Sequence, residues 1–109
     1  MISTEYILET ADEHEGKILF TIVHKQPFTV RVERGGLLVT RLFTDTTIRF
    51  SKHLLDRIAA IHNEAQSLKV TDYNRFCSNV GPILRLIQLA QGLPDPPRYR
   101  PPLRGMKSE

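Results

Sequence analysis

A pair of adjacent glycines, Gly35-Gly36, separates two apolar segments and constrains the fold more than any other feature of this sequence. Residues 28–34 (FTVRVER) alternate apolar and polar side chains with the period of a half-buried β-strand, and residues 37–43 (LLVTRLF) favour a second strand. A tight turn between such strands needs positive φ at its centre, which glycine adopts at little cost. The sequence therefore predicts a β-hairpin centred on Gly35-Gly36.

This turn predicts a register in which Val30 lies opposite Arg41 and Phe28 lies opposite Phe43. A second tight turn at Asp45-Thr46 places Phe43 opposite Ile48. Both turns put one set of apolar side chains on the same face of the sheet: Phe28, Val30, Val32, Val39, Phe43, Ile48 and Phe50. Two turns that converge on one apolar face predict an antiparallel meander.

Arg41 interrupts the predicted apolar face. We expect its aliphatic stem to cover Phe50 while its charged head reaches water. The alternative is a positive charge held at the sheet for an anionic partner.

The segments on either side extend this pattern. Residues 17–24 (KILFTIVH) predict another strand, and residues 5–10 a short one with Tyr6 and Leu8 turned inward. Downstream, Ser51 is a suitable N-cap for a helix whose apolar residues recur at helical spacing up to Leu68. A second helical region begins at Thr71 or Asp72, is interrupted at Gly81-Pro82, and resumes until Gly92.

These elements predict an α+β fold, with an antiparallel meander sheet of four or five strands followed by two C-terminal helices packed on one face. Helices on both faces are the main alternative. A chain of 109 residues suits one core, so we expect a single domain over residues 1–93. Residues 94–109 contain five of the seven prolines and predict an extended Pro/Arg-rich tail.

The single cysteine, Cys77, cannot form an internal disulfide, which favours a reducing compartment. The first residues lack the basic and apolar regions of a signal peptide, and no segment approaches the roughly 20 apolar residues of a membrane helix. We therefore expect a cytoplasmic protein with no membrane partner.

The sequence contains no common catalytic or cofactor motif. His53 and His62 fall on opposite sides of one predicted helix, and Cys77 falls on the inward side of the next, where a thiol is usually buried. We therefore expect no catalytic residues, no cofactor and no metal. A small enzyme without a recognisable motif stays an alternative.

An excess of apolar residues predicts a protein partner. Leu38 and Leu42 point away from the predicted core, and the last helix leaves Leu86 and Leu89 on an exposed flank. We interpret the chain as a small non-enzymatic protein-interaction module, an adaptor, inhibitor, complex subunit or homo-oligomer, with these four leucines at its interface. Alternatively, the acidic N-terminal segment or the proline-rich tail covers them.

Nucleic acid is the alternative partner. Arg31 and Arg49 share the outward face of the predicted sheet, where they can follow a phosphate backbone, and Tyr99 can stack on a base. The residues of this interpretation are Arg31, Arg41, Arg49, Arg98, Tyr99 and Arg100. Glu33 on the same face and a net charge of only +3 weigh against it.

Overall fold

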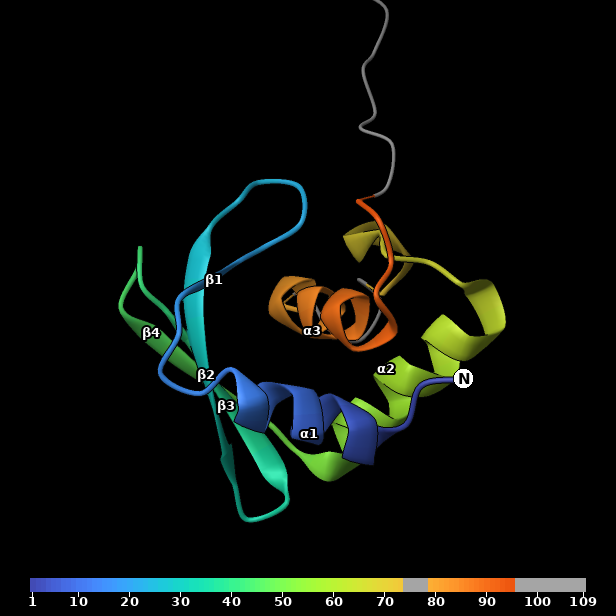
Figure 1. Ribbon diagram of the computed structural model, residues 1–109, viewed down its shortest axis with the longest axis horizontal. Helices are drawn as coiled ribbons and strands as arrows, with labels where there is room; N and C mark the ends of the chain where they lie inside the picture. The colour runs from blue at the N-terminus through green and yellow to red at the C-terminus, as the bar shows by residue number, and fades with distance from the viewer. Residues whose placement is uncertain (74–78, 96–109) are drawn as a thin grey trace, which may run out of the picture.

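The computed structural model of the chain describes residues 1–73 and 79–95 (Figure 1). Its elements are α1 (Thr4–Glu13), β1 (Leu19–Phe20), β2 (Pro27–Glu33), β3 (Gly36–Arg41), β4 (Thr46–Phe50), α2 (Lys52–Ala65), the 3-10 helix η1 (Val70–Asp72) and α3 (Gly81–Gln91). The four strands form one antiparallel sheet in the order β1-β2-β3-β4, which confirms the α+β class. Figure 1 shows the sheet on one side of the molecule and the helices α1, α2 and α3 together on the other.

The helix α1 corrects the prediction of a short strand at residues 5–10 and of helices only after the sheet. The Ser3 hydroxyl accepts a hydrogen bond from the Tyr6 N–H and caps the helix. The buried side chains include Thr4, Ile7 and Ala11, which have helical spacing. Tyr6 and Leu8 alternate with polar residues and thereby imitate a strand. The α1 helix packs against β2 and α3.

The first hairpin has the predicted positive φ, but its centre lies one residue earlier. Arg34 (φ 53°) and Gly35 (φ 74°) form the turn, and Gly36 already pairs with Glu33. Val30 therefore lies opposite Val39 and not Arg41. Gly36 is needed for space, because a Cβ there would lie 2.8 Å from the Phe50 carbonyl oxygen.

The second hairpin has a four-residue loop, 42–45, in place of the predicted tight turn. Ile48 lies opposite Val39 and not Phe43, a slip of four residues. Slips of two and four residues leave the side chains within the paired strands on their predicted faces, because the strand period is two. Phe28, Val30, Val39 and Phe50 are accordingly buried.

Phe43 and Arg41 depart from their predicted environments. Phe43 follows the end of β3 and is 84% exposed, so it is not part of the core. Arg41 lies opposite Phe28 and Thr46, whereas Phe50 lies opposite Leu37. The shifted register therefore does not place the Arg41 stem over Phe50. Arg41 is half-buried, and of its guanidinium nitrogens Nε is buried without a hydrogen-bond partner.

The predicted strand at 17–24 is paired only at Leu19–Phe20. Beyond Phe20, a backbone hydrogen bond from the Thr21 N–H to the Gln26 carbonyl closes a loop. The Thr21 hydroxyl also accepts from the Gln26 N–H at 3.0 Å. Within this loop Ile22 is buried and Lys25 adopts a φ of 53°.

The predicted caps of the C-terminal helices are confirmed. Ser51 accepts from the Leu54 N–H at the start of α2, and Gly92 ends α3 with a φ of 63°. His62 is buried, with Nδ1 3.0 Å from the Ser67 carbonyl oxygen and Nε2 2.9 Å from Gln91 Oε1. The Tyr73 hydroxyl donates to the same Ser67 carbonyl, and burial raises the pKa of Tyr73 to about 12.

The last helix lies at the centre of the helical layer (Figure 1). The fully buried side chains of α3 include Ile83, Leu86 and Ile87, and Leu89 is half-buried against the core. The expectation of an exposed flank at Leu86 is therefore wrong. The prediction failed because it did not include α1, which packs against α3 and covers its apolar surface.

Candidate functional site: the outward face of the sheet

The face of the sheet opposite the helices, called the outward face below, is not covered by any helix in the described part of the chain (Figure 1). Its members follow from the pairing register and from alternation with the buried residues. They are Phe20, Pro27, Thr29, Arg31, Glu33, Leu38, Thr40, Thr47 and Arg49, with Ile18 and Leu42 at the margin. This face divides into an apolar end, a central groove and a charged end.

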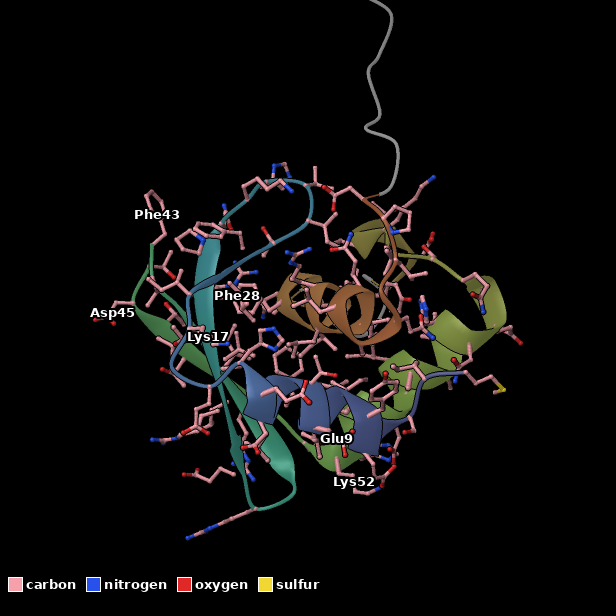
Figure 2. The ribbon with its side chains drawn as sticks, in the orientation of Figure 1. Glu9, Lys17, Phe28, Phe43, Asp45 and Lys52 are labelled. Carbon is pink, nitrogen blue, oxygen red and sulfur yellow. The ribbon has the colours of Figure 1, made fainter. Side chains whose placement is uncertain are left out.

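The apolar end consists of Ile18, Phe20 and Leu42. Phe20 lies opposite Pro27, and the Leu42 N–H donates to the Pro27 carbonyl at 3.2 Å, so these side chains belong to neighbouring segments of the sheet. Ile18 is 56% exposed, Phe20 49% and Leu42 40%. Phe43 follows directly and projects away from the body of the molecule (Figure 2). A grouping of large exposed apolar side chains is typical of a binding surface.

The centre of the outward face is a groove of about 400 Å³. Its described lining consists of Glu15, Gly16, Thr29, Val30, Arg31, Leu38, Thr40 and Thr47. The hydroxyls of Thr40 and Thr47 lie 3.1 Å apart across β3 and β4. Glu15 and Gly16 come from the connection between α1 and β1, which forms one wall. The groove offers the hydroxyl groups of three threonines, the half-buried Leu38 and two charged side chains, Glu15 and Arg31.

Three charged side chains occupy the other end of the outward face. Arg31 Nη2 lies 3.4 Å from Glu33 Oε2, and Arg49 Nη1 lies 3.8 Å from Glu33 Oε1. The three side chains are 43–60% exposed, so each pair contributes at most about 1 kcal/mol. One carboxylate therefore offsets part of the positive charge of both arginines.

The structure separates the residues predicted for the interface. Leu42 lies at the apolar end and Leu38 on the floor of the groove, whereas Leu86 is fully buried and Leu89 is half-buried in the helical layer. Ile18 and Phe20 alternate with the buried Leu19 and share the apolar end with Leu42, although they are not among the four leucines predicted for the interface.

The residues predicted for nucleic-acid binding also separate. Arg31 and Arg49 share the outward face, as expected, but Arg41 belongs to the opposite face. Arg98, Tyr99 and Arg100 lie outside the described residues, as does Cys77.

Within residues 1–73 and 79–95, no group of three His, Cys, Asp or Glu side chains is arranged to hold a metal ion. In the same residues, no helix is both long and apolar enough to cross a membrane.

Comparison with protein-family models, curated proteins and solved structures gives no significant match. The functional argument therefore rests on the surfaces of this chain.

Proposed function

We propose that this protein is a small non-enzymatic protein-interaction module that binds another protein chain through the outward face of its sheet. The observation that supports the proposal most is the grouping of Ile18, Phe20 and Leu42, each at least 40% exposed, on a face that no described helix covers. Removal of such apolar area from water is the main favourable term in protein association.

The partner packs an apolar surface on Phe20 and Leu42 and extends toward the groove, where Thr29, Thr40 and Thr47 supply hydroxyl groups. A second copy of this chain and a different protein both fit this description. The proposal includes a cytoplasmic location, supported by the single cysteine.

Two observations favour a protein over a nucleic acid at this face. Glu33 contacts both Arg31 and Arg49, which places a negative charge where a phosphate backbone would pass. Arg41, which the nucleic-acid interpretation also includes, belongs to the face of the sheet that packs against the helices. Nucleic-acid binding would be strongly salt-dependent, whereas apolar association would not.

The proposal is tested with a photo-crosslinking amino acid placed at Phe20 or at Leu42. The control position is Glu9, which is exposed on α1. In living cells and with purified protein, positions 20 and 42 are expected to give a discrete crosslinked protein, and position 9 none. The complex is expected to persist in 1 M NaCl.

The double variant Phe20→Lys, Leu42→Lys is expected to weaken the association at least tenfold by light scattering or calorimetry. The folded domain should persist, because both side chains are exposed. The matched control is Glu9→Lys, Glu13→Lys, which changes two exposed positions on the helical side. A monomeric wild type that gives no crosslink at either position, or equal crosslinks at position 9, contradicts the proposal.

A further inference from the structure

A second candidate site lies at the end of the sheet, on the side of the helices. It is a cavity of about 220 Å³, and its described lining is Thr21, Gln26, Pro27, Phe28, Arg41, Phe43, Thr44 and Pro82. These residues come from the β1–β2 loop, the facing ends of β2 and β3, the β3–β4 loop and the first turn of α3. This cavity is called the Arg41 pocket below.

Arg41 carries the only formal charge among the described lining residues. Its Nε is buried without a hydrogen-bond partner, and no ion pair joins Arg41 to another described residue. Burial of a polar nitrogen without a hydrogen bond is costly, so such a nitrogen usually has a partner in the protein or in a bound ligand. The planar guanidinium matches the two oxygens of a carboxylate or a phosphate.

The surroundings of Arg41 also favour an anion. Thr21, Thr44 and Gln26 contribute hydroxyl and amide groups to the wall. Pro82 belongs to the first turn of α3, and Val80, the N-cap residue of this helix, makes no side-chain capping hydrogen bond. The N-terminal end of a helix carries partial positive charge, which adds to that of Arg41.

The remaining walls are apolar. Phe28 closes the inner side of the Arg41 pocket, and Phe43, 84% exposed, stands at its mouth next to Pro27. Figure 2 shows Phe28 pointing toward the helices and Phe43 pointing outward. Walls of this kind suit a flat apolar body attached to the anionic group.

The β1–β2 loop, which forms one wall, is anchored to the helical layer. Lys25 Nζ lies 3.5 Å from Asp95 Oδ2, and the Gln88 side-chain amide donates to Asp95 Oδ1 at 2.7 Å. The hydrogen bond from Gln88 and the charge of Lys25 lower the pKa of Asp95, so Asp95 stays ionised beside Lys25 at neutral pH. The loop next to Gln26 thus has a surface ion pair with the segment that follows α3, which contributes at most about 1 kcal/mol.

We propose that the Arg41 pocket binds a small organic oxyanion, a carboxylate or a phosphate carried on a flat apolar group. Arg41 pairs with the oxyanion, and Phe28, Phe43 and the two prolines contact the apolar group. Pro27 borders both this site and the outward face. The other lining residues lie on the opposite face of the sheet, in loops or in α3, so the proposal does not depend on the function proposed for the outward face.

The test is a titration of the full chain, followed by ¹H–¹⁵N spectra, with benzoate, phenyl phosphate and inorganic phosphate. Benzoate or phenyl phosphate is expected to shift the signals of Thr21, Gln26, Thr44 and the Arg41 Nε–H in a saturable way, and their ratio of affinities identifies the preferred oxyanion. Inorganic phosphate is expected to bind at least tenfold more weakly than phenyl phosphate.

Arg41→Gln is expected to weaken binding of the preferred compound at least tenfold, whereas the matched control Arg49→Gln, on the outward face, changes it less than twofold. Phe43→Ala is expected to weaken the aromatic compounds about threefold and to leave inorganic phosphate unchanged. The same spectra report whether each variant is folded. If Arg41→Gln does not fold, Arg41→Lys replaces it in the test, because lysine keeps the positive charge but lacks the planar pair of N–H donors.

The proposal is overturned if neither aromatic compound gives saturable shifts in the wild type. It is also overturned if both Arg41 variants bind as the wild type does. Equal affinities for phenyl phosphate and inorganic phosphate would refute the role of the apolar walls.

Discussion

Phe28 and Phe20 belong to adjacent paired strands, yet Phe28 is 1% exposed and Phe20 49%. Their side chains leave the sheet on opposite faces. Phe28 meets the helical layer, whereas Phe20 lies on the face that no described helix covers. Both faces arise from the same alternation of side chains along the strands, so the sequence of a strand does not by itself distinguish a core face from an exposed one. The difference arises because the described α-helices pack on only one of the two faces.

Each face of the sheet also holds a residue whose environment is unusual for its type. Arg41 is a charged residue on the face of the core, and Gly36 is a sterically confined residue on the face open to solvent. Substitutions at these positions test how far the contrast between the two faces extends.

The largest expected effect is the contrast between the two phenylalanines. Phe28→Ala should lower the free energy of unfolding by about 3–5 kcal/mol, because it leaves a cavity in the core. Phe20→Ala should lower it by less than about 1 kcal/mol, because half of that side chain already meets water. Urea denaturation of both variants measures the contrast. Equal losses would show that the outward face is part of the folded core.

The second effect concerns the turn of the first hairpin. Gly36→Ala should cost about 1–3 kcal/mol, because the added Cβ meets the Phe50 carbonyl oxygen and forces the backbone to shift. Gly35→Ala should cost about 1 kcal/mol from its positive φ, since nothing lies within 4 Å of the added Cβ. Thermal denaturation compares the two. A larger loss at Gly35 would mean that φ, and not space, limits this turn.

The smallest expected effect is that of replacing Arg41. Arg41→Met should leave the free energy of unfolding unchanged or raise it by about 1 kcal/mol, because it removes a half-buried charge without a described partner. Arg49→Met on the outward face should lower it by less than about 1 kcal/mol through loss of the contact with Glu33. A fall of more than 1 kcal/mol in Arg41→Met, measured in urea, would contradict the view that Arg41 is kept for a ligand.

The faces of the side chains in the paired strands were predicted correctly, because an error of an even number of residues in the register does not change the face. Both hairpins were displaced by an even number of residues, so Val39 and Phe50 still reached the core. The displacement itself was not predictable from composition, because either Arg34-Gly35 or Gly35-Gly36 can supply a turn with positive φ. The loop at 42–45 contains no glycine to mark its length.

The helical layer was harder to predict. Residues 4–13 fit a strand through Tyr6 and Leu8 and a helix through Ile7 and Ala11, and only tertiary packing selects the helix. Once α1 was missed, Leu86 had no predicted neighbour and was assigned to the surface. At the candidate sites, alternation placed Leu42, Arg31 and Arg49 on the outward face. The Arg41 pocket joins residues of five elements, from residue 21 to residue 82, which no local pattern brings together.

The strand order β1-β2-β3-β4 repeats the order of the chain, so each pairing closes a loop of only a few residues. The helical layer is different: α1 contacts α3, and the Asn63 amide pairs with the main chain of Ile2, 61 residues away. Loop-closure entropy grows with loop length, and contacts between distant segments form late and slowly. We expect the hairpins to be formed in the folding transition state and the docking of α1 to follow. Destabilising substitutions in α1 should then accelerate unfolding and leave the folding rate nearly unchanged.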